Sequence, residues 1–476
     1  MISIKNKKAP ELLLPAGSLQ KAKFAFAYGA DAVYAGVPVF ALRAKENMFT
    51  IDKVKELVEY AHSIGKKIYL TINIYPHNKK LNSFMDAMEQ LVAVGPDAFI
   101  VSDPGIIHLI RRRWPLTVNG KSNPKYVELH LSVQQNTINW ASAAFWKANG
   151  ISRCILAREL SYEEVCEIVQ KNPDMEFEYF VHGAMCIAYS GRCLLSNYLA
   201  GRDANQGVCA QSCRWQYKVF KQNTVVGEQN AEKNIQETVK GKQETQTHPL
   251  QSNSNYSAPQ GNFVVEEQLR PNEFHSIQED ENGTYIMNSR DMCLIDYIPE
   301  LITSGVCSLK VEGRNKSEYY AAITAKAYRE AIDTYVQTGK PADTKKLLEE
   351  LQTAGNRGFM PGFFAGDLRE KSQRYESNKV LQTHIFVGVL KSFDVSTRKA
   401  TFHVKNRVDV GDDIELITPK KIISHKVTTL FNNCDKDVQS VHPGTGTFSI
   451  ILDKHVELDS EFVLARREGQ QKINKK

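Results

Sequence analysis

Between residues 11 and 313, short apolar runs alternate with longer stretches whose apolar side chains recur at helical spacing. Nearly continuous apolar runs predict strands buried on both faces, as in a parallel sheet covered by helices. Eight such strands are predicted, at residues 11–17, 31–36, 66–75, 97–105, 127–134, 153–160, 176–183 and 307–313. Eight strand–helix units predict an α/β fold, a (β/α)8 TIM-like barrel. An open doubly wound sheet has the same local pattern, but no glycine-rich phosphate fingerprint follows the first strand.

Apolar and polar positions alternate from Ile385 onward, which predicts several short strands and a small antiparallel β-barrel. Residues 222–272 are instead rich in Gln, Asn, Ser, Lys and Glu, and their scarce apolar side chains predict a disordered loop without a catalytic role. The predicted organisation is a barrel domain at 1–340 with a cysteine-rich insertion at 184–221 and the polar loop at 222–272, a connector at 341–383, the β-barrel domain at 384–468 and a basic tail at 469–476.

Polar side chains gather where the predicted strands end. Because the active sites of such barrels lie at the C-terminal ends of the strands, we expect these side chains to line one polar pocket. Each of them alone is as readily explained as a cap of a strand or helix. The predicted catalytic residues are His130, Arg158, His182, Glu312 and Arg314, and Asn73, Tyr75, Asp103, Ser132 and Gln134 also lie near strand ends. Arg43 and Arg192 are the predicted cofactor-binding residues, because converging guanidinium groups suit a dicarboxylate or a nucleotide.

Cysteines cluster directly after the seventh predicted strand. Four of the nine cysteines form the pattern Cys186-x6-Cys193-x15-Cys209-x3-Cys213. An iron–sulfur cluster is usually held by four thiolates, whereas a structural zinc ion usually has paired C-x2–4-C knuckles, of which only the last pair is an approximation. Reactive thiols are a third interpretation, because His182 precedes Cys186 closely. Cys293, on a stretch predicted to be helical at residues 290–305, is an alternative to Cys213 as the fourth ligand.

Composition limits the class of protein. No apolar run is long enough for a membrane span and no signal peptide is recognisable, so a cytoplasmic location without membrane contact is expected. Thiols are kept reduced in the cytosol, which favours metal binding or chemistry over disulfides. A formal net charge of +6 permits an anionic partner such as RNA. Neither H-E-x-x-H nor G-x-S-x-G is present, so two common hydrolase motifs are excluded.

The stretch EYFVHGAMCIAYSGRCLLS resembles the signature of peptidase family U32, and ELLLPAGSLQKAKFAFAYGADAVYAG and RDANQGVCAQSCRW are also similar to that family. The resemblance extends over nearly the whole chain and is strongest to the tRNA-hydroxylating members of the family. It implies a 4Fe–4S cluster on Cys186, Cys193 and Cys209, with Cys213 or Cys293 as the fourth ligand.

The same resemblance implies an oxygen-independent, prephenate-dependent hydroxylation of the wobble uridine of tRNA to 5-hydroxyuridine. The implied partners are the anticodon arm of tRNA, prephenate and an accessory iron–sulfur carrier. Two alternatives are a U32-type protease that acts on collagen-like substrates and an RNA-binding protein with a structural metal site.

Overall fold

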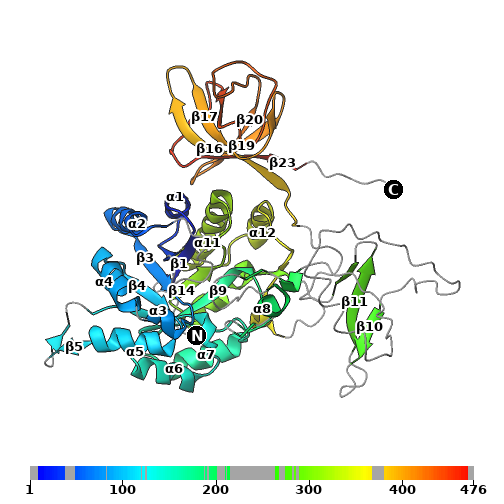
Figure 1. Ribbon diagram of the computed structural model, residues 1–476. Coiled ribbons are helices and arrows are strands. Elements are labelled where there is room, and N and C mark those ends of the chain that lie inside the picture. Colours follow the sequence, from blue (N-terminus) through cyan, green and yellow to red (C-terminus); the bar gives the residue numbers. More distant parts are fainter. Residues whose placement is uncertain are drawn as a thin grey trace, which may run out of the picture. The chain divides into compact units, whose positions relative to one another are not determined.

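Eight parallel strands close into a barrel, as the sequence predicts (Figure 1). They are β1 (Glu11–Ala16), β2 (Ala32–Gly36), β3 (Lys67–Ile72), β4 (Ala98–Val101), β7 (Leu129–Leu131), β8 (Arg153–Ile155), β9 (Glu176–Ala184) and β14 (Ser308–Val311). Each strand pairs with the next in this order, and β14 pairs with both β1 and β9. The pairing of β9 with β14 closes the ring, which excludes the open sheet.

The computed structural model describes residues 9–37, 49–81, 83–118, 121–123, 126–186, 188–189, 192–193, 195–200, 209–210, 212–214, 263–266, 274–280, 283–285, 289–366 and 380–469. Arg43 and most of the predicted polar loop lie outside these residues. The chain divides into two units, residues 1–213 with 288–476 and residues 214–287. The second unit contains the antiparallel strands β10 (Phe263–Glu266), β11 (Phe274–Asp280) and β12 (Gly283–Tyr285).

Helices surround the ring of strands (Figure 1). They are α1 (Leu19–Ala27), α2 (Ile51–Ser63), α3 (Asn78–Leu81), α4 (Phe84–Val94), α5 (Pro104–Arg113), α6 (Trp140–Ala148), α7 (Tyr162–Lys171), α10 (Ile298–Ser304), α11 (Glu318–Thr338) and α12 (Thr344–Gln352). Side-chain caps fix where several of them begin: Ser18 accepts a hydrogen bond from Lys21 N, and Ser161 forms a capping box with Glu164. Among the described residues, no helix has both the length and the apolar character that a membrane crossing requires.

The stretch that contains Cys293 corrects one prediction. Residues 290–305 were expected to be one helix, but Asp291–Cys293 form strand β13, and the helix α10 begins only at Ile298. Strand β13 pairs antiparallel with β9 and parallel with β15 (Phe359–Met360). Met292 to Ile295 are all buried, and a short run of this kind has no periodicity that distinguishes a buried strand from a helix.

The C-terminal residues form a separate antiparallel sheet, curled around its own core (Figure 1). Its order is β20 (Ile422–Lys426), β19 (Asp413–Ile417), β23 (Leu464–Glu468), β16 (His384–Asp394), β17 (Lys399–Val404) and β22 (Thr447–Ile451). The pairs β18 (Val408–Asp409) with β21 (Ser440–Val441), and β5 (Thr117–Val118) with β6 (Lys121–Ser122), are two-stranded. The stacked rings of Phe402 and Phe448, with centroids 5.3 Å apart, lie in this core. The antiparallel β domain predicted from the period of two is confirmed.

Arg466 joins the C-terminal sheet to the barrel domain. Its guanidinium forms ion pairs with Glu350 of α12 at 2.7 Å and with Glu415 of β19 at 2.6 Å. Tyr28, the C-cap of α1, has its hydroxyl 2.7 Å from the carbonyl oxygen of Ile417. The sheet therefore packs on helices at the outside of the barrel, on the side of α1, α11 and α12.

Candidate active site at the mouth of the barrel

An uncharged polar cluster lies at the C-terminal ends of β3, β4 and β7. The amide oxygen of Gln134 accepts hydrogen bonds from Asn73 Nδ2 at 2.7 Å, Ser102 Oγ at 3.0 Å and Ser132 Oγ at 3.2 Å. Ser132 follows the end of β7, and Gln134 lies in the short 3-10 turn that comes next, so both are on the C-terminal side of His130. Gln134 is 3% exposed. This cluster, which we call the Gln134 cluster, forms one side of the mouth.

A charged pair lies near the ends of β8 and β14. Arg158 Nη2 donates to Glu312 Oε2 at 2.8 Å, and Arg158 Nη1 donates to the carbonyl oxygen of Ala184 at 2.6 Å. The guanidinium lies 3.8 Å from the centroid of the Phe180 ring, a cation–π contact that holds its plane. The Arg158 side chain is 10% exposed and that of Glu312 is 19% exposed. This ion pair is therefore well oriented and largely withdrawn from bulk water.

Arg314 lies on the same strand end as Glu312 and points across the barrel. Its Nη1 donates to Thr71 Oγ1 of β3 at 2.8 Å, and its guanidinium lies 5.9 Å from the centroid of the Tyr34 ring. Of the five predicted catalytic residues, Arg158, Glu312 and Arg314 thus gather at the mouth. Their roles in catalysis stay a prediction.

His130 lies deeper, within the barrel. Its ring contacts that of Tyr69 edge-on, with centroids 4.7 Å apart. Burial lowers the pKa of His130 well below its usual value, and the charges of Arg153, Lys310 and Lys67 lower it further. The imidazole is therefore neutral across the physiological pH range, and it belongs to the layer below the Gln134 cluster.

His182 faces helix α11 on the outside of the barrel. Its ring packs against those of Tyr320, Tyr328 and Phe359, and its Nδ1 is 3.4 Å from the Tyr328 hydroxyl. Burial lowers the pKa of His182 to about 3, and Lys316 contributes to the same effect. The side chain therefore points away from the Arg158–Glu312 pair that it was expected to join.

The buried His182 should make the protein less stable in acid. The unfolded chain binds a proton at this residue below about pH 6.5, whereas the folded chain does so only near pH 3. The contribution of the neutral His182 to the free energy of unfolding is therefore fully present above pH 6.5. It decreases as the pH falls, by up to about 1.4 kcal/mol per pH unit. Between pH 7 and pH 5, urea unfolding of the wild type should lose about 2 kcal/mol more than His182→Phe. Equal losses would mean that His182 is protonated in the folded protein.

The cysteine-rich insertion begins where β9 ends. Cys186 is exposed, whereas Cys193, Cys209 and Cys213 are partly buried, and none of the nine cysteines, all within the described residues, is in a disulfide. Ala210 N donates to Ser196 Oγ at 2.8 Å, which brings the segments that carry Cys193 and Cys209 together. The insertion is thus anchored to itself close to two of its cysteines.

Arg192 places the insertion close to the mouth. Burial raises the pKa of the Tyr75 phenol, and the nearby Arg192 guanidinium opposes that rise, so Arg192 lies near the end of β3. Asp103 has a structural role there, because its carboxylate accepts a hydrogen bond from Ile106 N and caps α5.

The donor types of the insertion suit a thiolate-bound cluster. Four cysteines lie on one segment outside the apolar core, two of their segments are hydrogen-bonded to each other, and thiolate sulfur is the donor that iron–sulfur clusters use. Within the described part of the chain, no group of three or more His, Cys, Asp or Glu side chains is arranged to hold a metal ion.

Cys293 has a different environment from these four cysteines. It is buried in β13, and its Sγ lies 3.6 Å from the Tyr328 hydroxyl. Its Cα pairs with that of His182, while Asp291 pairs with Ala184. Burial raises the pKa of the Cys293 thiol to about 11. This thiol is therefore a protonated core side chain beneath α11.

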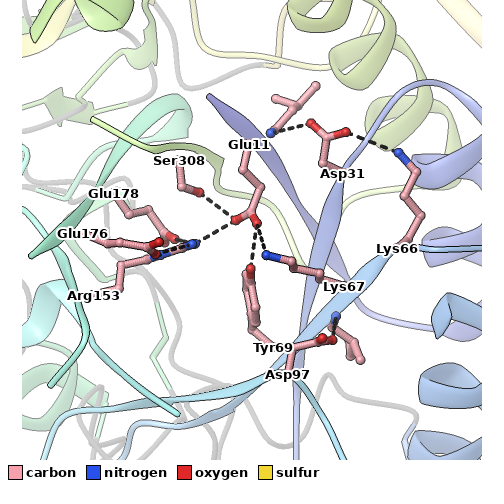
Figure 2. A network of polar contacts seen from close by, with 12 residues as sticks. Glu11, Asp31, Lys66, Lys67, Tyr69, Asp97, Arg153, Glu176, Glu178 and Ser308 are labelled. Atoms are coloured by element: carbon pink, nitrogen blue, oxygen red, sulfur yellow. Dashed lines mark hydrogen bonds and ion pairs between the residues drawn. The ribbon is translucent and has the colours of Figure 1, made fainter. Parts of the chain in front are cut away.

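Sequence reasoning missed a network of charged side chains at the N-terminal ends of the strands (Figure 2). Arg153 Nη1 lies 2.7 Å from Glu11 Oε1, and Tyr69 donates its hydroxyl to Glu11 Oε2 at 2.7 Å. Lys310 Nζ lies 2.7 Å from Glu178 Oε1, and both side chains are almost completely buried. Charged residues at alternate strand positions, such as Lys310 and Glu312, were the available signal. Residues at the N-terminal end of such barrels usually contribute to the stability of the fold.

Gly183 allows β9 to approach β14 at the mouth. Its φ is 109°, and an added Cβ would lie 2.7 Å from the carbonyl oxygen of Glu312. We expect Gly183→Ala to cost about 1–3 kcal/mol in unfolding free energy, because it adds a contact with backbone to a strained conformation. Gly65→Ala is the matched control, because Gly65 also has a positive φ but has no atom within 4 Å of the added Cβ. Equal losses of stability in the two variants, measured by urea unfolding, would contradict the close approach.

Comparisons with known proteins agree over nearly the whole chain. The family model described as Peptidase family U32 matches residues 17–374, and that of the Peptidase family U32 C-terminal domain matches residues 382–461. The chain is 42% identical to tRNA hydroxylation protein P of Escherichia coli strain K12 over 96% of both chains. It is 40% identical to the protein of the same name from Haemophilus influenzae, again over 96% of both chains. The solved structure of a U32 peptidase aligns with 39% of this chain and 74% of its own, at 13% identity and a TM-score of 0.31.

Proposed function

Because the chain belongs to peptidase family U32, we propose that it is a tRNA-modifying enzyme that hydroxylates the wobble uridine at C5, using a 4Fe–4S cluster and prephenate. The observation that carries the proposal is the 42% identity, over 96% of both chains, with a tRNA hydroxylation protein P. The polar mouth of the barrel, beside the cysteine-rich insertion, supports a site where a redox group and a polar substrate would meet.

Cys186, Cys193, Cys209 and Cys213 would hold the cluster, which supplies one-electron chemistry when bound. Cys293 is the weaker candidate for the fourth ligand. It pairs with His182 inside β9, before that strand ends at Ala184, whereas Cys186 lies beyond the end of the strand. Its thiol is also buried against Tyr328, and burial raises its pKa.

Two alanine variants test this assignment of the ligands. Cys213→Ala should lose iron and the visible absorbance of the cluster after anaerobic reconstitution, because a thiolate is removed. Cys293→Ala should retain both and should lose only some stability, about 1–2 kcal/mol, because a small buried side chain is truncated. Iron content per chain and absorbance decide the result. Retention of a full cluster by Cys213→Ala, together with its loss in Cys293→Ala, would reverse the assignment.

Arg158 and Arg314 suit the carboxylates of prephenate, because a guanidinium binds a carboxylate through paired hydrogen bonds. His130 and His182 have lowered pKa values and would contribute no positive charge at neutral pH. The two arginines and Glu312 would therefore set the charge of the mouth. Arg192, close to Tyr75, would add a further positive charge from the insertion.

Mass spectrometry of tRNA nucleosides tests the proposed function. A strain that lacks this gene and its paralogues should lack 5-hydroxyuridine and its derivatives, and a plasmid copy of the gene should restore them. Unchanged 5-hydroxyuridine in the deletion strain would exclude the hydroxylase. The peptidase alternative predicts instead that purified protein cleaves gelatin, and that this cleavage survives substitution of the insertion cysteines.

A further inference from the structure

We propose that Gln134 is a binding residue at the mouth of the barrel, whose amide Nε2 donates a hydrogen bond to a carboxylate oxygen of the small-molecule substrate. The inference rests on the proposed function, because that function supplies the carboxylate ligand. Gln134 is assigned to the carboxylate neither by the family match nor by the arginines at the mouth.

The Gln134 amide has a fixed orientation. Its Oε1 accepts three hydrogen bonds, from Asn73 Nδ2, Ser102 Oγ and Ser132 Oγ. The Ser132 hydroxyl oxygen also accepts the backbone N–H of Gln134 at 3.5 Å, so its proton is directed to Oε1. The opposite orientation would place two amide NH₂ groups, of Gln134 and Asn73, against each other. The oxygen therefore faces the protein.

The nitrogen of the Gln134 amide can still donate hydrogen bonds. Gln134 Nε2 is buried and has no acceptor among the described residues. A buried donor without an acceptor costs about 1–3 kcal/mol, so native proteins rarely keep one without a ligand or water to accept it. Arg158 Nε, in the turn that follows β8, is a second buried donor without an acceptor in the described part of the chain. Both donors come from side chains that line the mouth.

The backbone that carries Gln134 is held firmly. The Tyr75 hydroxyl donates to the carbonyl oxygen of Gln134 at 3.0 Å, and Gln135 Nε2 donates to that hydroxyl at 3.3 Å. Asn136, which follows, has a positive φ of 50° and ends the short 3-10 turn at Val133–Gln135. The amide is therefore preorganised, which reduces the entropy that a ligand must overcome when it binds.

The outward-facing donor of Gln134 favours one kind of ligand over another. A uracil base presents a carbonyl acceptor beside an N–H donor, and an amide reads such an edge with its oxygen and nitrogen together. The oxygen of Gln134 is already occupied three times, so only a donor faces outward. A group that only accepts, beside the arginines of the mouth, matches this arrangement better than the base does. A carboxylate is such a group.

Calorimetric titration with prephenate at pH 7.5 tests the proposal. Gln134→Glu keeps an oxygen for Asn73, Ser102 and Ser132 but replaces the donor by a second acceptor. We expect its Kd for prephenate to rise by about 10–100-fold, because a hydrogen bond to a charged group is lost. The affinity should partly return near pH 5, where the new carboxyl group is more often protonated and donates. Gln20→Glu, an equal change of charge at an exposed position of α1, should keep the wild-type Kd.

Gln134→Met is a second test variant if the first one fails to fold. It removes the donor without adding charge and should also weaken prephenate binding at least 10-fold. A wild-type Kd for prephenate in the variant that folds would overturn the inference. It would mean that Gln134 Nε2 donates no hydrogen bond to the ligand. If the purified wild-type protein does not bind prephenate, although the gene restores 5-hydroxyuridine in the deletion strain, the proposed subsite is wrong. The tRNA hydroxylation function is then unaffected. If 5-hydroxyuridine is unchanged in the deletion strain, the proposed function is wrong, and the titration with prephenate still decides whether Gln134 binds this ligand.

Discussion

Replacing Lys310 with methionine should lower the free energy of unfolding by about 3–5 kcal/mol, the usual cost of breaking a buried ion pair from one side. Lys310 Nζ lies 2.7 Å from Glu178 Oε1, and the Glu178 side chain has no exposed surface. Without Lys310, the one ion pair left to Glu178 among the described residues is a longer contact with Arg153, at 3.4 Å. Burial lowers the pKa of Lys310 and Glu178 opposes this, as expected of a charge held in place by its partner. Urea unfolding at pH 7.5 measures the effect.

The double variant Lys310→Met with Glu178→Gln is the matched control. It removes both charges and should recover a large part of the lost stability, because replacing both partners of a buried pair is far less costly than removing one. A loss below about 1 kcal/mol in the single variant would contradict a charged pair at this position. A double variant that is less stable than the single one would mean that Glu178 is stabilised mainly by Arg153.

Replacing Arg158 with methionine should reduce 5-hydroxyuridine in tRNA to the level of the deletion strain while the protein stays folded. The guanidinium joins Glu312, Ala184 and the Phe180 ring, so it orients the only ion pair found at the mouth within the described residues. Its loss would remove a carboxylate-binding group and leave Glu312 without this partner. Nucleoside mass spectrometry of the complemented strain gives the result, and the circular dichroism spectrum and Tm show whether the variant folds.

The Arg158→Lys variant sharpens this prediction. Lysine keeps the charge but lacks the planar fork that contacts both Glu312 and Ala184, so we expect less than about one tenth of wild-type modification. Wild-type levels of 5-hydroxyuridine in folded Arg158→Met would show that the mouth pair has no part in the reaction. The double variant Arg158→Met with Glu312→Gln should be no more defective than the single one, because the two residues act as a unit.

The barrel could be predicted because each strand is a continuous apolar run between two amphipathic helices. The direction in which the His182 side chain points could not be predicted from the sequence. Phe180 faces the interior, where Arg158 and Lys310 lie near its ring, so alternation predicts His182 on the same face. The register shifts between Lys310 and Val311, which pair with Phe180 and His182, so β9 has one extra residue there. Such a bulge turns the side chains that follow to the other face, and no sequence pattern marks it.

The same limit applies to the charged network within the barrel. Glu11 and Arg153 form an ion pair at 2.7 Å although 141 residues separate them in the sequence. A charged residue at the start of a strand is ordinarily read as a solvated end, and only closure of the ring shows that several of them face one another (Figure 2). The mouth was easier to predict because the strand-end rule applies to every barrel strand. Gln134 was found by that rule, but only the structure shows that its Nε2 is a buried donor without an acceptor among the described residues.

Hydroxylation of tRNA by purified components is the decisive test of the proposed function. Protein with an anaerobically reconstituted cluster is incubated with unmodified tRNA, with and without prephenate and without oxygen, and its nucleosides are analysed by mass spectrometry. We expect 5-hydroxyuridine only in the presence of prephenate, and none when Cys186→Ala replaces the wild type. A fully loaded protein that forms no 5-hydroxyuridine under these conditions, or a Cys186→Ala variant that forms as much as the wild type, would contradict the proposed function.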